Sequence, residues 1–155
     1  GLWNARALLE GQPRFVILNV DILTTLDLHR LISFHVQHQC LISLATMQRK
    51  SSRQLLVDAQ HRLAGWENKA TGEIRIAQPA GNSQGTGLQA VAYSGIAVMD
   101  SGIFSRMHHR GKFSILETYL DLAPRDIILC FDHTGDKFID VGKPESVLQA
   151  EQLFP

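Results

Sequence analysis

The stretch FVILNVDIL, Phe15–Leu23, decides how the rest of the chain is interpreted. Its nearly continuous apolar character is typical of a strand that is covered on both faces, as in a parallel α/β sheet. Asp21 interrupts the run close to its end. Because an ionised carboxylate beside a buried strand is costly unless it is paired or binds a cation, we interpret Asp21 as a candidate functional residue.

The segments around this stretch predict a strand–helix–strand unit. Residues 1–12 have a helical pattern that Gly11 is placed to end, and residues 25–39 have the spacing of a second helix, capped at its start by Thr24 or Thr25. Residues 41–47, LISLATM, read as the next strand. Such a unit is expected to have a right-handed crossover.

The remaining segments complete an α/β pattern. We expect one domain, residues 1–155, with a mostly parallel central sheet and an inserted meander of short antiparallel strands over residues 53–77. Ser114 and Glu117 match a capping box at the start of a later helix. The other predicted elements are a glycine-rich loop at 78–87, strands at 88–99, 126–131 and 137–141, and helices at 114–123 and 143–154.

Composition narrows the class of protein. Of 155 residues, 45% are hydrophobic and 19% are charged, and fifteen basic residues balance fifteen acidic ones, so no nucleic-acid or membrane-surface footprint is indicated. With no membrane span or leader, and with Cys40 and Cys130 interpreted as reduced and buried, we expect a cytoplasmic protein. The chain starts without Met inside a helical pattern, so we expect an N-terminally incomplete domain.

Asp21 and Asp140 occupy similar contexts. Each ends a short strand-like run, and each is followed by a turn and then a helix. In open α/β sheets ligands collect outside the carboxyl ends of strands, and two carboxylates delivered to that edge can hold a hard cation such as Mg²⁺. The alternative is that such an Asp caps the next helix or faces solvent.

Four segments together resemble the sugar-nucleotidyltransferase family, also called nucleotide-diphosphosugar pyrophosphorylases. FVILNVDIL resembles the family strand that ends in an N/G-x-D element, and FIDVGKPESVLQAEQL resembles its late D-x-G-T/K-P-E motif with the helix that follows. YSGIAVMDSGIF and GKFSILETYLDLA are similar to the segments between them, in the same order. The resemblance covers nearly the whole chain.

The resemblance implies a Rossmann-like three-layer fold and an activity. The family joins a sugar 1-phosphate to a nucleoside triphosphate and releases pyrophosphate. Asp21 and Asp140 match its two metal-binding aspartates, so the resemblance implies that both are catalytic and bind Mg²⁺. Gly95 matches the glycine whose backbone lies close to the sugar. Asn19 is expected to line the pocket, and Glu67 and Asn68 are candidate sugar contacts.

The sequence departs from the family at its start. The glycine-rich, basic nucleotide loop of the family, roughly G-x-G-T-R, has no counterpart here, and the loop GNSQGTG at residues 81–87 has no basic residue. We therefore expect the C-terminal portion of such an enzyme, inactive alone. Lys143 stands where many family members have Thr, and it either reaches a phosphate or is a solvated helix-start lysine. The alternative function is a non-catalytic, nucleotidyltransferase-like binding or regulatory domain. The base, the sugar and a homo-oligomeric state are left open.

Overall fold

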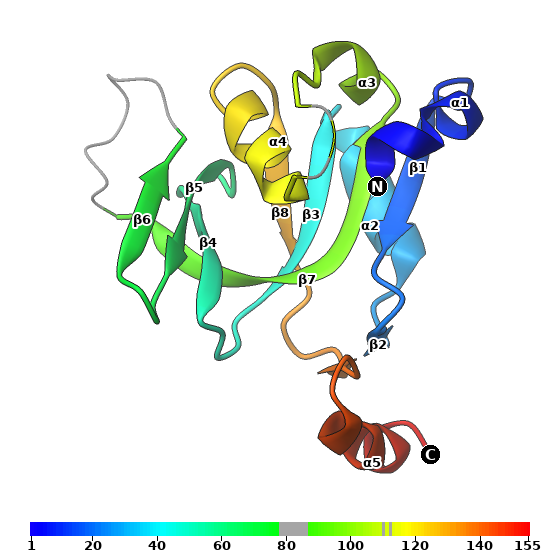
Figure 1. Cartoon of the computed structure of the whole chain (residues 1–155), viewed down its shortest axis with the longest axis vertical. Helices are drawn as coiled ribbons and strands as arrows, with labels where there is room; N and C mark the ends of the chain where they lie inside the picture. Colours follow the sequence, from blue (N-terminus) through cyan, green and yellow to red (C-terminus); the bar gives the residue numbers. More distant parts are fainter. Residues whose placement is uncertain (78–86, 110, 112) are drawn as a thin grey trace.

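The computed structural model describes residues 1–77, 87–109, 111 and 113–155. Its centre is a seven-stranded sheet in the order β6-β5-β4-β7-β3-β8, with β1 also paired to β7 (Figure 1). A separate two-stranded sheet pairs β2 with β9. The strands are β1 Arg14–Leu18, β2 Ile22–Thr24, β3 Ile42–Met47, β4 Arg53–Val57, β5 Leu63–Asn68, β6 Glu73–Ile76, β7 Gln89–Asp100, β8 Ile128–Asp132 and β9 Phe138–Asp140.

Helices cover both faces of the central sheet. Alternate residues of β7 enter different clusters: Ala97 and Met99 belong to the larger apolar core with α3 and α4, whereas Ile96 and Val98 pack with α2. This arrangement is the expected α/β layering. The helical elements are η1 Leu2–Ala5, α1 Arg6–Leu9, α2 Leu28–Gln37, α3 Ile103–Arg106, α4 Ile115–Leu122 and α5 Pro144–Leu153.

The prediction of a mostly parallel sheet is wrong. Of the strand pairs that the described residues form in the central sheet, only β3 with β8 is parallel. The pairs made by β1, β3 and β4 with β7 are antiparallel, as is the meander β4-β5-β6. The long strand β7 inserts between β1 and β3 and runs against both. An apolar strand that is buried on both faces has the same residue pattern in either direction, so the sequence did not reveal this reversal.

The strand directions nevertheless deliver several chain segments to one edge. Because β1 and β3 both run antiparallel to β7, they run parallel to each other, and β8 is parallel to β3. The segments that follow these three strands therefore leave the sheet at the same edge. Those segments contain Asn19 and Asp21 after β1, Arg49 after β3, and the loop toward Asp140 after β8.

The stretch FVILNVDIL is two strands rather than one. β1 ends at Leu18, a turn follows, and β2 begins at Ile22 in the smaller sheet. Val20 in the turn is fully exposed. Asp21 therefore lies between two sheets, immediately before its chain pairs with β9.

Helix starts are partly as predicted. Asp27, not Thr24 or Thr25, caps α2, and its carboxylate accepts a hydrogen bond from the His29 backbone N–H at 2.8 Å. Ser114 caps α4 as predicted. Glu117 does not complete a capping box with its side chain, because both of its carboxylate oxygens accept hydrogen bonds from the Arg75 guanidinium at 2.7 Å.

Other predictions concern the core and the loop. Cys40 and Cys130 are free and buried, as expected. The antiparallel meander is confirmed, whereas the predicted loop at 78–87 lies almost wholly outside the described residues. Within the part of the chain that the structure describes, no helix is long and apolar enough to cross a bilayer.

Candidate functional site

The structure brings Asp21 and Asp140 together through the small β2-β9 sheet. Ile22 is the cross-strand partner of Asp140, and the Val141 backbone N–H donates to the Asp21 carbonyl oxygen at 2.8 Å. These pairings fix the backbones of the two aspartates side by side, although 118 positions separate them along the chain. The Asp21 side chain is half-buried and that of Asp140 is exposed.

Gly142 marks the point on which the two carboxylates converge. A Cβ atom placed on Gly142 would lie 3.0 Å from Asp140 Oδ1 and 3.1 Å from Asp21 Oδ2. The two oxygens are therefore no more than about 6 Å apart, and modest rotation would bring them to the ~3–4 Å that ligands of one Mg²⁺ ion require at bond lengths of about 2.1 Å. The Gly142 backbone N–H donates to Asp140 Oδ1 at 2.9 Å and orients that carboxylate.

This donor set suits a hard divalent cation. Mg²⁺ in proteins commonly takes one or two carboxylates and keeps its other positions for water and phosphate oxygens. Among the described residues, no group of three or more His, Cys, Asp or Glu side chains could hold a metal ion. The chain thus offers two converging carboxylates beside a glycine without a side chain, and the rest of a coordination shell would come from solvent or ligand.

Asn19 and Gly95 lie in direct contact, next to this carboxylate pair. The Asn19 backbone N–H donates to the Gly95 carbonyl oxygen at 3.0 Å. Gly95 has φ +73°, and a Cβ there would lie 2.8 Å from Asn19 Nδ2. The conformation favours glycine, because L-residues rarely adopt it, and any side chain there would displace the Asn19 amide. Two of the predicted site residues therefore form one unit.

A cavity opens beside this unit. It has a volume of ≈ 790 Å³ and is lined by residues of η1, β1, β7 and α4. Asn19 and Tyr93 contribute polar groups to an otherwise largely apolar lining. Residues 92–95 of β7 lie between the segment that pairs with β4 and the segment that pairs with β1. Because Tyr93 belongs to this stretch and lines the cavity, the cavity borders the part of β7 that contains Gly95.

Glu67 and Asn68 lie on the meander, at the end of β5. Asn68 Oδ1 accepts a hydrogen bond from the Ala70 backbone N–H at 3.0 Å, and Glu67 Oε1 lies 3.5 Å from Lys69 Nζ. Within the described residues, these polar contacts lie inside their own hairpin, and β5 lies on the opposite side of the view from β2 (Figure 1). Their role as sugar contacts stays a prediction.

Sequence reasoning missed Arg49. Its Nη2 donates to the Tyr93 carbonyl oxygen at 3.0 Å, and its guanidinium carbon lies 4.5 Å from the centre of the Phe138 ring. Burial lowers the pKa of Arg49, and the negative charge of Asp140 acts in the opposite direction. The guanidinium still carries its positive charge, because arginine side chains are not deprotonated in proteins. The signal available was a charged residue two positions after the strand predicted at residues 41–47.

Two buried polar side chains are in contact next to Gly95. Ser94 and His133 are both buried, and Ser94 Oγ lies 2.8 Å from His133 Nε2. His133 Nδ1 lies 3.4 Å from Asp136 Oδ2. Burial lowers the pKa of His133, while Asp136 acts to raise it. These contacts connect β7 to the loop that leads into β9, and therefore connect the glycine unit to the strand that carries Asp140.

Comparison with known proteins places the fold. No family model and no curated protein matches the sequence. Similar solved structures include HddC from Yersinia pseudotuberculosis (21% identity, TM-score 0.69, 99% of this chain and 60% of that chain). UDP-glucose pyrophosphorylase from Acinetobacter baumannii is similar at 16% identity (TM-score 0.71, 96% and 53%). The inositol-1-phosphate CTP transferase from T. maritima is similar at 13% identity (TM-score 0.68, 98% and 58%).

These comparisons confirm the resemblance found in the sequence at the level of the fold. The chain has a nucleotidyltransferase fold and spans little more than half the length of each of these proteins. HddC has also been solved with GMP-PN, and the Acinetobacter pyrophosphorylase with UTP.

Proposed function

We propose that the protein acts as a nucleotidyltransferase that joins a sugar 1-phosphate to a nucleoside triphosphate, giving a nucleotide-sugar and pyrophosphate. The observation that carries the proposal is the convergence of Asp21 and Asp140 at Gly142. The fold similarity to nucleotidyltransferases supports the reaction class. The proposed setting is cytoplasmic.

The proposed reaction is a displacement between two anions. A sugar phosphate oxygen attacks the α-phosphorus of the triphosphate in line, the bond from that phosphorus to the bridging oxygen breaks, and pyrophosphate leaves on the opposite side. Bound Mg²⁺ would offset the charge of the phosphate oxygens. Asp21 and Asp140 would hold it, and the Gly142 N–H keeps Asp140 oriented. Neither carboxylate has to act as a base, because the attacking phosphate is already ionised.

The proposed substrate contacts follow from the neighbouring cavity. Asn19 lines it and is fixed against Gly95, so its amide could hydrogen-bond a sugar or nucleoside hydroxyl. The absence of a side chain on Gly95 is what lets the Asn19 amide lie against its backbone. Glu67 and Asn68 remain candidates for the far side of the sugar.

The proposal is tested first by metal binding, which does not depend on turnover. Mn²⁺, a paramagnetic substitute for Mg²⁺, is titrated into the chain and its free fraction is followed by electron paramagnetic resonance. Asp21→Asn and Asp140→Asn should each weaken Mn²⁺ binding about tenfold or more, since neutral amides are poorer ligands than carboxylates. The control is Glu73→Gln, an exposed residue on β6 that should not change the affinity.

Turnover is then screened with triphosphates and sugar 1-phosphates, using this chain and the complete product of its gene. Pyrophosphate release that is lost in Asp140→Asn but kept in Glu73→Gln would support the enzyme. Wild-type Mn²⁺ affinity in both aspartate variants would refute the metal assignment. Asp-dependent Mn²⁺ binding without turnover by the complete gene product would favour the non-catalytic binding domain.

A further inference from the structure

Arg49 is held more firmly than an ordinary surface arginine. It lies in the loop after β3, half-buried, with one nitrogen bonded to the Tyr93 carbonyl and its planar face on Phe138. Its Nε is buried and has no hydrogen-bond partner among the described residues. Leaving a buried donor unpaired is unfavourable, so the local structure holds this guanidinium in place despite a cost.

Arg49 lies on the same face of β9 as Asp140. Phe138 and Asp140 are two positions apart on one strand, so their side chains point to the same side. Arg49 packs on Phe138 and is close enough to Asp140 for their charges to interact. The guanidinium therefore lies on the side of β9 from which the Asp140 carboxylate projects.

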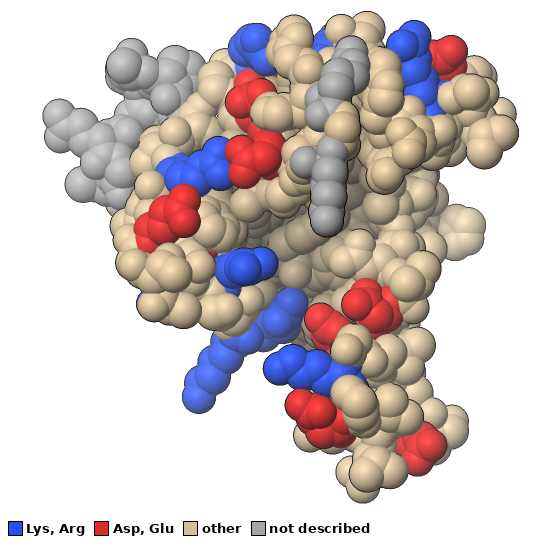
Figure 2. Space-filling view, in the orientation of Figure 1, with Lys and Arg blue, Asp and Glu red and all other residues tan. Residues whose placement is uncertain are grey.

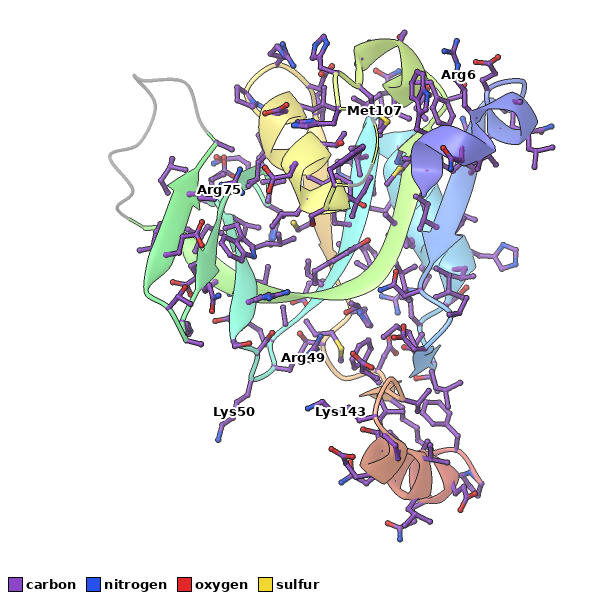
Figure 3. The ribbon with its side chains drawn as sticks, in the orientation of Figure 1. Arg6, Arg49, Lys50, Arg75, Met107 and Lys143 are labelled. Carbon is purple, nitrogen blue, oxygen red and sulfur yellow. The ribbon has the colours of Figure 1, made fainter. Side chains whose placement is uncertain are left out.

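Two lysines extend this positive region. Lys50 follows Arg49 in the same loop, and Lys143 precedes the first turn of α5, whose N-terminus carries partial positive charge. Figure 3 shows Lys143 reaching from α5 toward the loop of Arg49 and Lys50. Figure 2 shows basic and acidic side chains gathered where the α5 end of the molecule meets the main body.

We propose that Arg49, with Lys143 beside it, forms a binding subsite for a diphosphate group next to the Asp21–Asp140 pair. A divalent cation would balance the two carboxylates, which leaves the charges of Arg49, Lys50 and Lys143 to balance a phosphate chain. The fixed, planar guanidinium suits phosphate oxygens better than a mobile ammonium does. The subsite would be built entirely from side chains of the loop after β3 and of the start of α5.

The choice of a diphosphate rests on the proposed function, but the anion test needs neither metal nor turnover. Inorganic pyrophosphate is titrated into the metal-free chain by isothermal calorimetry, with orthophosphate and UDP-glucose in parallel titrations. Arg49→Gln should weaken pyrophosphate binding about tenfold or more. Arg49→Lys should lose part of the affinity, because lysine keeps the charge but lacks the paired N–H donors of the planar guanidinium. Arg125→Gln, an exposed arginine before β8, is the matched control and should bind as wild type.

Because Lys143 is exposed, its substitution tests pyrophosphate binding without a change in stability. Lys143→Thr should weaken pyrophosphate binding several-fold with an unchanged thermal midpoint, whereas Arg49→Gln could also loosen the contact with Phe138. If substitution of Arg49 and Lys143 weakens the binding of UDP-glucose but not that of pyrophosphate, the subsite binds the diphosphate of the product. Equal binding of both diphosphates by wild type and both variants, or binding by none of them, overturns the subsite. Loss of Mn²⁺ binding in Asp140→Asn is a separate result and bears only on the metal.

Discussion

Replacing Gly95 with alanine should disturb the site and the stability of the fold together. The new Cβ would lie 2.8 Å from Asn19 Nδ2 and 3.0 Å from Asn19 Cγ, so the Asn19 side chain would have to rotate away. The backbone at Gly95 also has φ +73°, which an alanine adopts with strain. The two effects act at one residue, and a control is needed to separate them.

The magnitude follows from these two terms. The left-handed conformation costs an L-residue roughly 1–2 kcal/mol, and pushing the exposed Asn19 side chain out of its present position adds about 0.5–1.5 kcal/mol. Gly95→Ala should therefore lower the free energy of unfolding by about 1.5–3.5 kcal/mol. For a domain of this size, each kcal/mol lowers the thermal midpoint by about 2–4 °C.

Gly72 provides the matched control. It has φ +75°, nearly the value at Gly95, but a Cβ there would meet no atom within 4 Å. Gly72→Ala should cost only the conformational term, about 1–2 kcal/mol. Urea denaturation of both variants, and of Gly95→Ala combined with Asn19→Ala, measures the difference. The double variant should recover most of the excess cost. A Gly95→Ala variant as stable as Gly72→Ala would refute the contact argument.

Three further perturbations follow from the described contacts. Burial lowers the pKa of His35 and of His133, so the unfolded chain binds more protons than the folded chain near pH 6. The free energy of unfolding should therefore fall as the pH drops below about 6.5. Urea denaturation at several pH values should show a weaker pH dependence in His133→Asn than in wild type. Asp27→Ala removes the cap of α2 and should cost about 1 kcal/mol by urea denaturation. Glu117→Gln weakens the contact with Arg75, but both side chains are about a third exposed, so the loss should be below about 1 kcal/mol and shrink in high salt.

The sequence was informative about which residues meet and poor on strand direction. Asp21 and Asp140 were grouped because each follows an apolar run and precedes a helix, and the β2-β9 pairing brings them together. Asn19 and Gly95 were proposed separately as pocket residues and turn out to touch. Local patterns of this kind can be read from the sequence, because they reflect burial and turn chemistry, which act over a few residues.

What the sequence could not supply depends on distant pairing. The turn within FVILNVDIL forms because β2 pairs with β9, more than a hundred positions away, and the apolar Val20 gives no local sign of its exposure. The insertion of β7 between β1 and β3 is likewise a tertiary choice. Arg49 was missed for the same reason, since only the folded chain places it over Phe138.

The wrong sheet direction and the convergence of Asp21 with Asp140 have a common explanation. The inference about ligand sites at carboxyl ends of strands requires only that the strands that deliver the site residues be parallel to one another. β1, β3 and β8 meet that requirement, although β7 runs against β1 and β3 between them. The antiparallel strand β7 does not change the edge at which the carboxyl ends of β1, β3 and β8 lie. It also places Gly95, with φ +73°, against Asn19. Carboxylates after β1 and near β9, and a guanidinium after β3, therefore reach one edge of a largely antiparallel sheet.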